Sequence, residues 1–236
     1  RLARERGIKV LLSGSGGDDL FTGYRRHLAL RYEGLWSWLP KTARQGLESF
    51  SLGLNQSKTL GRRLSRLFNN AGASGDERLT AYFAWARRDD LEPLFSPEMR
   101  DAVKSIRPEQ PMLDFLDGVD AGLSTIDRML TLEQRFFLAD HNLIYTDKMS
   151  MAAGVEVRVP FLDLDLVELA ASIPDQFKQK GLIGKWVLKK AMEPYLPHDV
   201  IYRPKTGFGA PLRRWIKYDL RELISDVLSV QSIQSR

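Results

Sequence analysis

The first regular pattern in the chain is an apolar run followed by a glycine-rich loop and the start of a helix. Residues 8–12 are apolar apart from Lys9, and turn-forming residues follow them directly. Such a run predicts a short buried strand of the kind that parallel sheets contain. After the loop, the apolar residues of segment 20–24 have the spacing of one helix face. Segment 8–24 therefore predicts a strand, a loop and a helix in succession.

Helical periodicity dominates the rest of the chain. Apolar positions recur every three or four residues, with breaks at Pro40 and in the small polar segment 69–75. The longest periodic segment spans residues 124–146. We find neither an internal repeat nor a low-complexity segment. One strand followed by many helices predicts a helix-rich chain.

The loop at residues 13–17, Ser-Gly-Ser-Gly-Gly, carries the clearest chemical signal. Its glycines allow positive φ angles and close approach to a ligand, and its N–H groups can converge on an anion. Asp18 and Asp19 follow, and two carboxylates would repel a phosphate unless a divalent cation lay between them. Mg²⁺ prefers a few carboxylates together with phosphate oxygens. The pattern therefore indicates a magnesium–nucleotide site, although an ordinary turn with two helix-capping acids would have the same sequence.

Segment 140–163 combines charges with many small and apolar residues. Buried charges require a partner or a ligand. Two interpretations are open, namely a substrate pocket and an internal ion-pair network in which Glu156 pairs with Arg158 or Lys148. The charged residues concerned are Asp147, Lys148, Glu156 and Arg158.

A third segment combines a predicted basic helix at 184–195 with the turn-rich stretch 202–211. Lys205 lies there between Pro204 and a Gly-Phe-Gly turn. This position suits a mobile loop that carries a cation to an anionic leaving group. An exposed lysine without a function fits the same pattern.

The amino-acid composition excludes several classes of protein. The 236 residues are 43% apolar and 28% charged, which is ordinary for a globular chain of one domain or one and a half. The absence of cysteine excludes disulfides and thiolate metal sites and gives no sign of secretion. The net charge of +5 is modest and dispersed, and no apolar run reaches the roughly 18 to 20 residues of a membrane span. We expect a cytoplasmic protein with no nucleic-acid or membrane partner.

The three segments together resemble the synthetase domain of the glutamine-dependent asparagine synthetases. Three motifs carry the resemblance: Ser-Gly-x-Gly-x-Asp-Asp-Leu-Phe-x-Gly-Tyr at 13–24, Asp-Lys-x-Ser-Met-Ala-x-x-Val-Glu-x-Arg-x-Pro-Phe-Leu-Asp at 147–163, and Arg-x-Lys-x-Gly-Phe at 203–208. The resemblance implies an α/β domain of ATP-pyrophosphatase type, with a partial parallel sheet of its last strand or two and a large helical C-terminal part. ATP and Mg²⁺ would adenylate aspartate, and ammonia from an N-terminal glutaminase domain would attack the β-aspartyl-AMP. A homodimer is compatible with this family.

The resemblance also implies roles for individual residues. Asp18 matches the carboxylate that holds magnesium on the pyrophosphate, with Asp19 as a second candidate, and Lys205 matches the lysine that stabilises the pyrophosphate. The residues that match ATP contacts are Ser13, Gly14, Gly16 and Gly17. Those in the family signature, expected to shape the acceptor pocket, are Asp147, Lys148, Glu156, Arg158 and Asp163.

Two departures from the family pattern bear on function. Ser15 stands where the family usually has a glutamate that helps to form and use the acyl-adenylate, so another carboxylate such as a uronic acid is an alternative substrate. The family's Ser-Gly-Gly-x-Asp-Ser phosphate loop is missing from the sequence. We therefore expect residues 1–236 to be the C-terminal portion of the synthetase domain and to be inactive alone. A catalytically silent homologue that serves as a binding scaffold is a third hypothesis.

Overall fold

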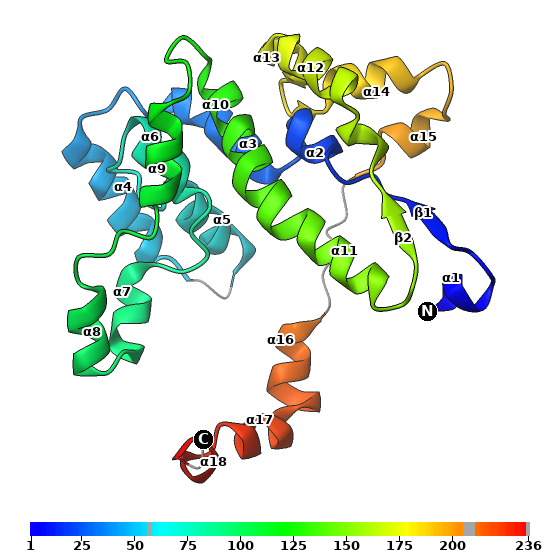
Figure 1. The fold of residues 1–236 in the computed structure, drawn as a ribbon. Coiled ribbons are helices and arrows are strands. Elements are labelled where there is room, and N and C mark those ends of the chain that lie inside the picture. The colour runs from blue at the N-terminus through cyan, green and yellow to red at the C-terminus, as the bar shows by residue number, and fades with distance from the viewer. Residues whose placement is uncertain (56–57, 205–210, 235–236) are drawn as a thin grey trace. The chain divides into compact units, whose positions relative to one another are not determined.

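The computed structural model describes residues 1–55, 58–204 and 211–234 (Figure 1). The chain divides into two units, Arg1–Met192 and Glu193–Arg236. The first two motifs belong to the first unit. The third motif, at 203–208, belongs to the second unit, and Lys205 itself lies outside the described residues.

The predicted strand is present and forms part of a parallel sheet. β1 (Val10–Leu12) pairs with β2 (Glu156–Arg158), with Val10 opposite Glu156 and Leu12 opposite Arg158. This pair confirms the mixed α/β character and the partial parallel sheet. The sequence pattern located only β1, because β2 has only three residues and two of them are charged, which leaves no apolar pattern.

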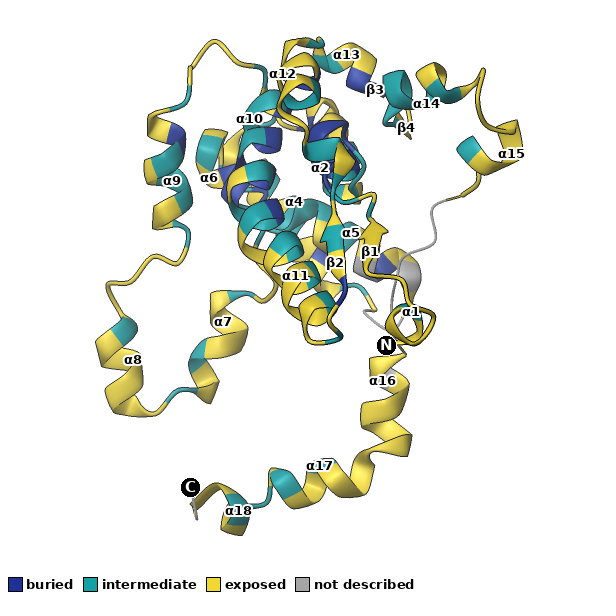
Figure 2. Ribbon diagram, turned by 45° about the vertical axis from the view of Figure 1, so that its right-hand side comes forward, coloured by how far each residue is buried: buried dark blue, intermediate teal, exposed yellow. Residues whose placement is uncertain are grey.

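The expectation that β1 is buried is also wrong. Leu12 is 74% exposed, and Val10 and Leu11 are exposed too (Figure 2). A sheet of two strands leaves each strand one open edge, and in the described residues β1 has β2 as its only neighbour. An apolar run thus identified the strand but not its burial.

A second small sheet lies near the end of the first unit. β3 (Gln179–Lys180) and β4 (Ile183–Gly184) form an antiparallel hairpin, which the sequence did not predict. The turn contains Gly181 at φ 58°, a left-handed conformation that glycine adopts without strain. Strands of two residues are too short for alternating polarity to identify.

Helices make up most of the first unit, and their ends follow local signals. α4 begins directly after Pro40, as predicted, and α8 begins at Pro97 with Ser96 as its N-cap. The helices other than the long one described below are α1 (Leu2–Glu5), α2 (Gly17–Leu20), α3 (Arg25–Tyr32), α4 (Lys41–Gly53), α5 (Thr59–Phe68), α6 (Gly75–Ala81), α7 (Arg88–Leu91), α8 (Pro97–Val103), α9 (Gln110–Asp117), α12 (Leu164–Ser172), α13 (Asp175–Lys178) and α14 (Trp186–Met192). Short 3₁₀ segments occur at Glu33–Leu35, Glu92–Leu94 and Pro160–Leu162.

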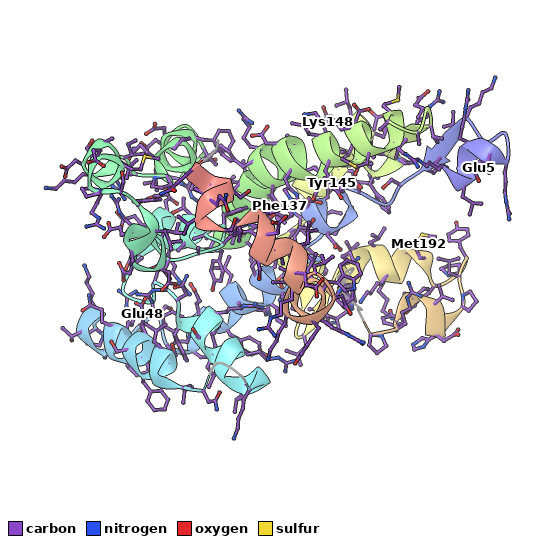
Figure 3. The ribbon with its side chains drawn as sticks, turned by 90° about the horizontal axis from the view of Figure 1, so that it is seen from below. Glu5, Glu48, Phe137, Tyr145, Lys148 and Met192 are labelled. Atoms are coloured by element: carbon purple, nitrogen blue, oxygen red, sulfur yellow. The ribbon has the colours of Figure 1, made fainter. Side chains whose placement is uncertain are left out.

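The predicted long helix is present, but its middle is wound differently. α10 (Thr125–Leu132) continues through a π-helical segment (Glu133–Leu143) into α11 (Ile144–Met151). Ser124 caps the start, because its hydroxyl accepts the N–H of Asp127 at 3.1 Å. Phe137, Tyr145 and Lys148 all project from this one continuous helix (Figure 3).

Two apolar clusters hold the first unit together. The larger joins α3, α6, α9 and α10 around the fully buried Met129 and Leu132. The smaller joins Leu20 and Phe21, at the end of α2, to Ala170 of α12. This second cluster fixes the short helix that follows the glycine loop against the residues of the family signature.

The second unit is helical and largely exposed in the residues described. Its helices are α15 (His198–Ile201), α16 (Leu212–Arg214), a π segment (Trp215–Asp219), α17 (Arg221–Val227) and α18 (Val230–Gln234). The predicted basic helix of 184–195 corresponds to α14, which ends at Met192 in the first unit.

Candidate functional site

The glycine loop begins where β1 meets β2. The N–H of Ser13 donates to the carbonyl of Arg158 at 2.8 Å, which extends the strand pairing by one residue. The Ser13 hydroxyl then accepts the N–H of Ser15 at 3.2 Å, and the two hydroxyl oxygens lie 2.9 Å apart. A hydroxyl that accepts a nearby backbone N–H is a common way to start a turn. The loop is therefore anchored at its first residue.

The second half of the loop packs on the family signature. Gly16 has φ 93°, and a Cβ at this residue would lie 2.5 Å from Cδ2 of Leu162. A Cβ at Gly17 would lie 3.6 Å from the ring of Phe161. Gly16 thus meets two requirements for glycine, a left-handed backbone and a close neighbour. The structure brings the first two motifs together, although about 140 residues separate them.

Asp18, the proposed magnesium carboxylate, has a cationic partner that the sequence did not reveal. The ammonium Nζ of Lys185 donates to Oδ1 of Asp18 at 2.7 Å. Both side chains are partly buried. Lys185 directly follows the β3–β4 hairpin and belongs to the predicted basic segment, but that segment contains several lysines with nothing to distinguish this one.

The backbone around this pair is strained. Lys185 has φ 55° and Thr22 has φ 62°, both left-handed values at residues other than glycine. The N–H of Lys185 donates to the carbonyl of Phe21 at 2.8 Å, and a Cβ at Gly184 would lie 2.2 Å from the Thr22 carbonyl oxygen. A left-handed conformation costs roughly 1–2 kcal/mol per residue. Both strained residues lie where the β3–β4 hairpin packs against the turn after α2. This packing places the Lys185 side chain next to Asp18.

A second lysine adds positive potential near Asp18. Lys189 lies one turn further along α14, and its backbone N–H donates to the Lys185 carbonyl at 2.9 Å. Burial, together with the charge of Lys185, lowers the pKa of Lys189, while Asp18 acts in the opposite direction. The site therefore combines one carboxylate with two neighbouring ammonium groups, a balance that favours an anionic ligand.

Asp19 lies in a different environment. Asp19 is only 1% exposed, and the Tyr24 hydroxyl lies 3.2 Å from each of its carboxylate oxygens. Burial, reinforced by the charge of Glu133, raises the pKa of Asp19 from 3.8 to about 6. Because the carboxylate is buried and engaged by Tyr24, it does not suit a ligand of a solvent-accessible metal. The magnesium role considered below is therefore restricted to Asp18.

The signature charges are on the surface, which corrects the expectation that they are buried. Glu156 and Arg158 form the ion pair that the sequence suggested, with 2.7 Å between Oε1 and Nε, but both side chains are more than half exposed. Asp147 and Lys148 are exposed on α11, where they line a shallow hollow with Leu143 and Ile144. Strand β2 and helix α11 each leave one face open, so these charges need no buried partner.

Asp163 has a structural role in the described part of the chain. Its carboxylate accepts the N–H of Asp165 at 3.2 Å and caps the start of α12. This helix packs on α2 through the smaller apolar cluster. By capping α12, Asp163 therefore helps to position α2, the helix that follows the glycine loop.

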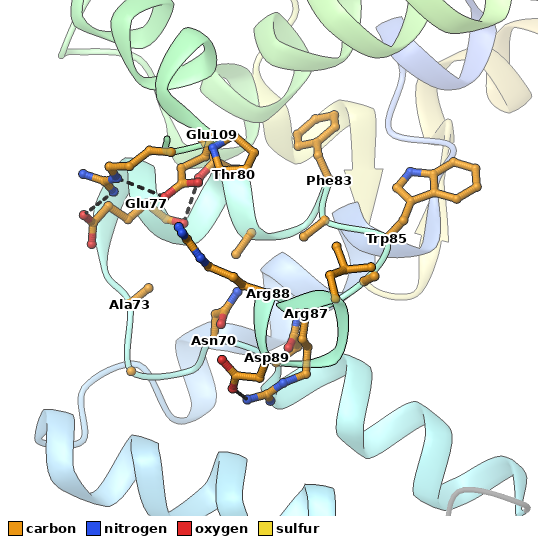
Figure 4. A pocket seen from close by; sticks show the side chains of 18 of the residues that line it. Asn70, Ala73, Glu77, Thr80, Phe83, Trp85, Arg87, Arg88, Asp89 and Glu109 are labelled. Carbon is orange, nitrogen blue, oxygen red and sulfur yellow. Dashed lines mark hydrogen bonds and ion pairs between the residues drawn. The ribbon is translucent and has the colours of Figure 1, made fainter. Parts of the chain in front are cut away.

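A sizeable cavity lies away from the loop. It encloses about 950 Å³ between α4, α6, α7 and α9 and contains none of the predicted site residues that the structure describes (Figure 4). Several of its charged lining residues are paired within the protein, as in the contacts of Arg87 with Glu48 and Asp89 and of Arg107 with Glu77. We assign it no ligand.

Asp18 is the one accessible carboxylate that the described part of the candidate site offers to a metal ion. Within residues 1–55, 58–204 and 211–234, no group of three or more His, Asp or Glu side chains could hold a metal ion. In the same described ranges, no helix is long and apolar enough to cross a membrane. An ion at Asp18 would thus need further ligands from a bound molecule, such as phosphate oxygens.

These features define an α/β chain whose candidate site is a serine–glycine loop after a parallel strand, closed by a carboxylate–lysine pair. The chain belongs to the asparagine synthase family, whose family model matches residues 1–236. No solved structure matches the chain.

Several curated relatives support the family assignment. A putative asparagine synthetase [glutamine-hydrolyzing] of Mycobacterium tuberculosis is 32% identical over 224 residues, covering 92% of this chain and 32% of the relative. Asparagine synthetase [glutamine-hydrolyzing] 1 of Bacillus subtilis is 30% identical over 227 residues, covering 94% of this chain and 34% of the relative. The nodule asparagine synthetase of Pisum sativum is 40% identical over 77 residues, covering 29% of this chain and 13% of the relative. The chain thus spans about a third of the length of the first two relatives.

Proposed function

We propose that this chain is the synthetase part of a glutamine-hydrolysing asparagine synthetase, a ligase that uses ATP to activate aspartate. The carboxylate of aspartate would attack the α-phosphate of ATP and release pyrophosphate. Ammonia from a glutaminase domain would then attack the aspartyl adenylate to give asparagine and AMP. The observation that carries the proposal is the strand–loop–carboxylate–lysine arrangement in a chain that matches the family over its whole length.

Each part of the candidate site has a task in this reaction. The N–H groups of the loop at 13–17 would bind phosphate oxygens, as such loops do in many nucleotide sites. Asp18 would hold Mg²⁺, and its single accessible carboxylate fits an ion that takes its other ligands from phosphates and water. A bound Mg²⁺ would neutralise the charge that develops on the departing pyrophosphate.

Two lysines would also stabilise the negative charge that develops on the departing pyrophosphate. Lys185 pairs with Asp18 and could turn towards a bound polyphosphate, since an ammonium group on a flexible chain can exchange one anionic partner for another. Lys205 keeps its proposed role at the pyrophosphate through the family motif. Electrostatic stabilisation of this kind supplies much of the rate in phosphoryl and nucleotidyl transfer.

One observation favours an acceptor other than aspartate. Ser15 presents a hydroxyl 2.9 Å from the Ser13 hydroxyl, where a carboxylate is usual in this family. A neutral hydroxyl does not act as a base near pH 7 and leaves the loop without a negative charge at this position. A larger carboxylate such as a uronic acid is therefore the second candidate acceptor. The acceptor pocket would involve the signature residues Asp147, Lys148, Glu156, Arg158 and Asp163.

The setting of the reaction is also part of the proposal. ATP, glutamine and aspartate are metabolites of the cytoplasm, where we place the enzyme. We expect neither a nucleic-acid nor a membrane partner, and a homodimer stays a prediction that light scattering would check.

The test is ATP–pyrophosphate exchange by the full-length natural polypeptide that carries this sequence. The assay contains Mg²⁺ and no amine donor, and it compares aspartate with a panel of uronic acids. We expect exchange that depends on an acid and that Asp18→Asn and Lys205→Ala reduce by at least tenfold. Lys104→Ala is the matched control, because Lys104 is an exposed lysine in the helical region away from the loop.

The outcomes separate three hypotheses. Exchange with aspartate establishes asparagine synthesis despite Ser15. Exchange with uronic acids alone assigns the chain to a related amide synthetase with another acceptor. Absence of exchange with every acid, in a polypeptide that still binds ATP, indicates a silent homologue with a binding role.

A further inference from the structure

The π-helical segment Glu133–Leu143 makes two separate contacts with the residues that follow the glycine loop. At its first residue, the fully buried Glu133 pairs with the guanidinium of Arg26 and lies 3.1 Å from Nε2 of His27. Near its end, Nδ2 of Asn142 donates to the Tyr24 hydroxyl at 3.1 Å. Between them, the ring of Phe137 packs edge-on against Tyr24, with 5.4 Å between centroids.

These contacts depend on the winding of the segment. An α-helix turns by about 100° per residue, so Glu133 and Asn142, nine positions apart, would lie on opposite faces. A π-helix turns by only about 80° per residue, so nine residues return to nearly the same face. The π winding therefore directs Glu133, Phe137 and Asn142 towards one target. Such segments are rare, and they occur frequently at functional sites.

The target is a chain of hydrogen bonds that ends beside the proposed ligand site. The backbone N–H of Tyr24 donates to Nδ1 of His27 at 3.3 Å, so the imidazole carries its proton on Nε2 and donates it to Glu133. The Tyr24 hydroxyl, which accepts from Asn142, donates to the carboxylate of Asp19. Asp19 lies on α2 next to Asp18, the proposed magnesium carboxylate.

The rest of the cluster restrains Tyr24. The guanidinium carbon of Arg26 lies 4.5 Å from the centre of the Tyr24 ring and 4.2 Å from that of Phe137. Burial raises the pKa of Tyr24 above its usual value, so the hydroxyl remains a donor at any working pH. Ring and hydroxyl are therefore both fixed by residues of the long helix or of α3.

We propose that Tyr24 is a positioning residue for nucleotide binding: held by Asn142 of the π segment, its hydroxyl fixes Asp19 and thereby the orientation of α2 and Asp18. This inference rests on the proposed function, because Asp18 is taken to act on MgATP. It assigns a function to the π winding, which brings Asn142 to the same face as Glu133.

The test measures the KM values of MgATP and of the acceptor acid separately, by ATP–pyrophosphate exchange with the full-length natural polypeptide. Tyr24→Phe removes the hydroxyl and keeps the ring. We expect the KM of MgATP to rise by roughly threefold to tenfold, the effect of one or two hydrogen bonds, with an unchanged KM for the acid. Tyr145→Phe, an exposed tyrosine of the same helix, is the matched control and should change neither value.

A double-mutant cycle tests the route of the effect. Asn142→Ala should raise the KM of MgATP in the wild-type background and have no further effect in Tyr24→Phe, because Asn142 acts through the hydroxyl that this variant lacks. Asn142→Ala also keeps the inference testable if Tyr24→Phe does not fold. The midpoint of urea unfolding is recorded for every variant, since a purely structural role lowers that midpoint and leaves the KM of MgATP unchanged.

Three results would overturn the inference. An unchanged KM of MgATP in both single variants removes the positioning role, and additive effects in the cycle remove the route through the hydroxyl. An equal rise in both KM values indicates general disturbance of the site. If the wild type shows no exchange with any acid, the proposed function fails instead, so the two failures are distinguishable.

Discussion

The ammonium of Lys185 and the carboxylate of Asp18 are hydrogen-bonded at 2.7 Å, although 167 residues separate them in the sequence. The contact exists because the β3–β4 hairpin presses on the turn after α2, with Lys185 and Thr22 both at positive φ. A strained backbone that persists in a folded protein is compensated by its surroundings and often marks a functional position. Here it brings a cation to the residue proposed to hold magnesium.

The strain at Lys185 predicts an unusual order of stability between two variants. Lys185→Ala and Lys185→Gly both remove the ammonium, but only glycine adopts φ 55° without cost. We expect the glycine variant to be the more stable of the two by about 1 kcal/mol in urea unfolding. Both should lose ATP–pyrophosphate exchange to a similar extent. Equal stability of the two variants would show that the left-handed backbone at Lys185 is not strained.

We expect a side chain at Gly23 to clash with Asp18 in the turn after α2. A Cβ at this residue would lie 1.8 Å from Oδ1 of Asp18 and 2.6 Å from its Cα, so Gly23→Ala requires backbone movement. We expect a loss of about 1–3 kcal/mol in the free energy of unfolding. Gly34→Ala is the matched control, because a Cβ at Gly34 meets nothing within 4 Å. Thermal unfolding of both variants, followed by circular dichroism, measures the difference, and similar midpoints would contradict the prediction.

The ion pairs of the site segments differ in their expected contributions to stability. Glu133 is fully buried between Arg26 and His27, so Glu133→Gln leaves a partly buried guanidinium without its counter-charge. We expect a loss of about 3 kcal/mol. Arg158→Gln breaks the exposed pair with Glu156 and should cost less than about 1 kcal/mol. Denaturant unfolding that ranks Arg158→Gln as the more damaging variant would refute this assignment.

We expect the free energy of unfolding to depend on pH through the protonation of Asp19. Its pKa is raised from 3.8 to about 6, chiefly by burial, so the folded state binds more protons than the unfolded state between these values. Stability contributed by the neutral acid is therefore lost as the pH rises through this window. Asp19→Asn stays neutral, so its stability relative to the wild type should increase by about 2 kcal/mol from pH 4 to pH 7. Unfolding without Mg²⁺ or nucleotide at several pH values measures it, and a constant difference between the two proteins would contradict the raised pKa.

Local features of the fold followed from the sequence. Strand β1, the loop after it and the helix break at Pro40 were predicted at the positions where they occur. Each is set by residues within a few positions of one another, such as an apolar run, a cluster of glycines or a proline. The motif order also predicted the family, which the family model confirms over residues 1–236.

The features that were missed depend on distant neighbours. Burial of β1 was predicted from its apolar residues, but burial is decided by what covers a strand, and β1 has a single neighbour in the described residues. Strand β2 exists because β1 lies beside it, since its three residues carry no strand pattern of their own. The π winding of Glu133–Leu143 was invisible for a similar reason, because helical periodicity predicts a helix without specifying its turn.

The candidate site shows the same division. The sequence by itself determined which groups are available, namely the serine–glycine loop, the two adjacent aspartates and a lysine-rich helix. Only the tertiary structure decided that Asp18 faces Lys185 while its neighbour Asp19 is buried against Tyr24. The physical reason is that adjacent side chains on a helix point about 100° apart, so the elements packed around α2 determine which carboxylate meets solvent and cations and which meets the interior.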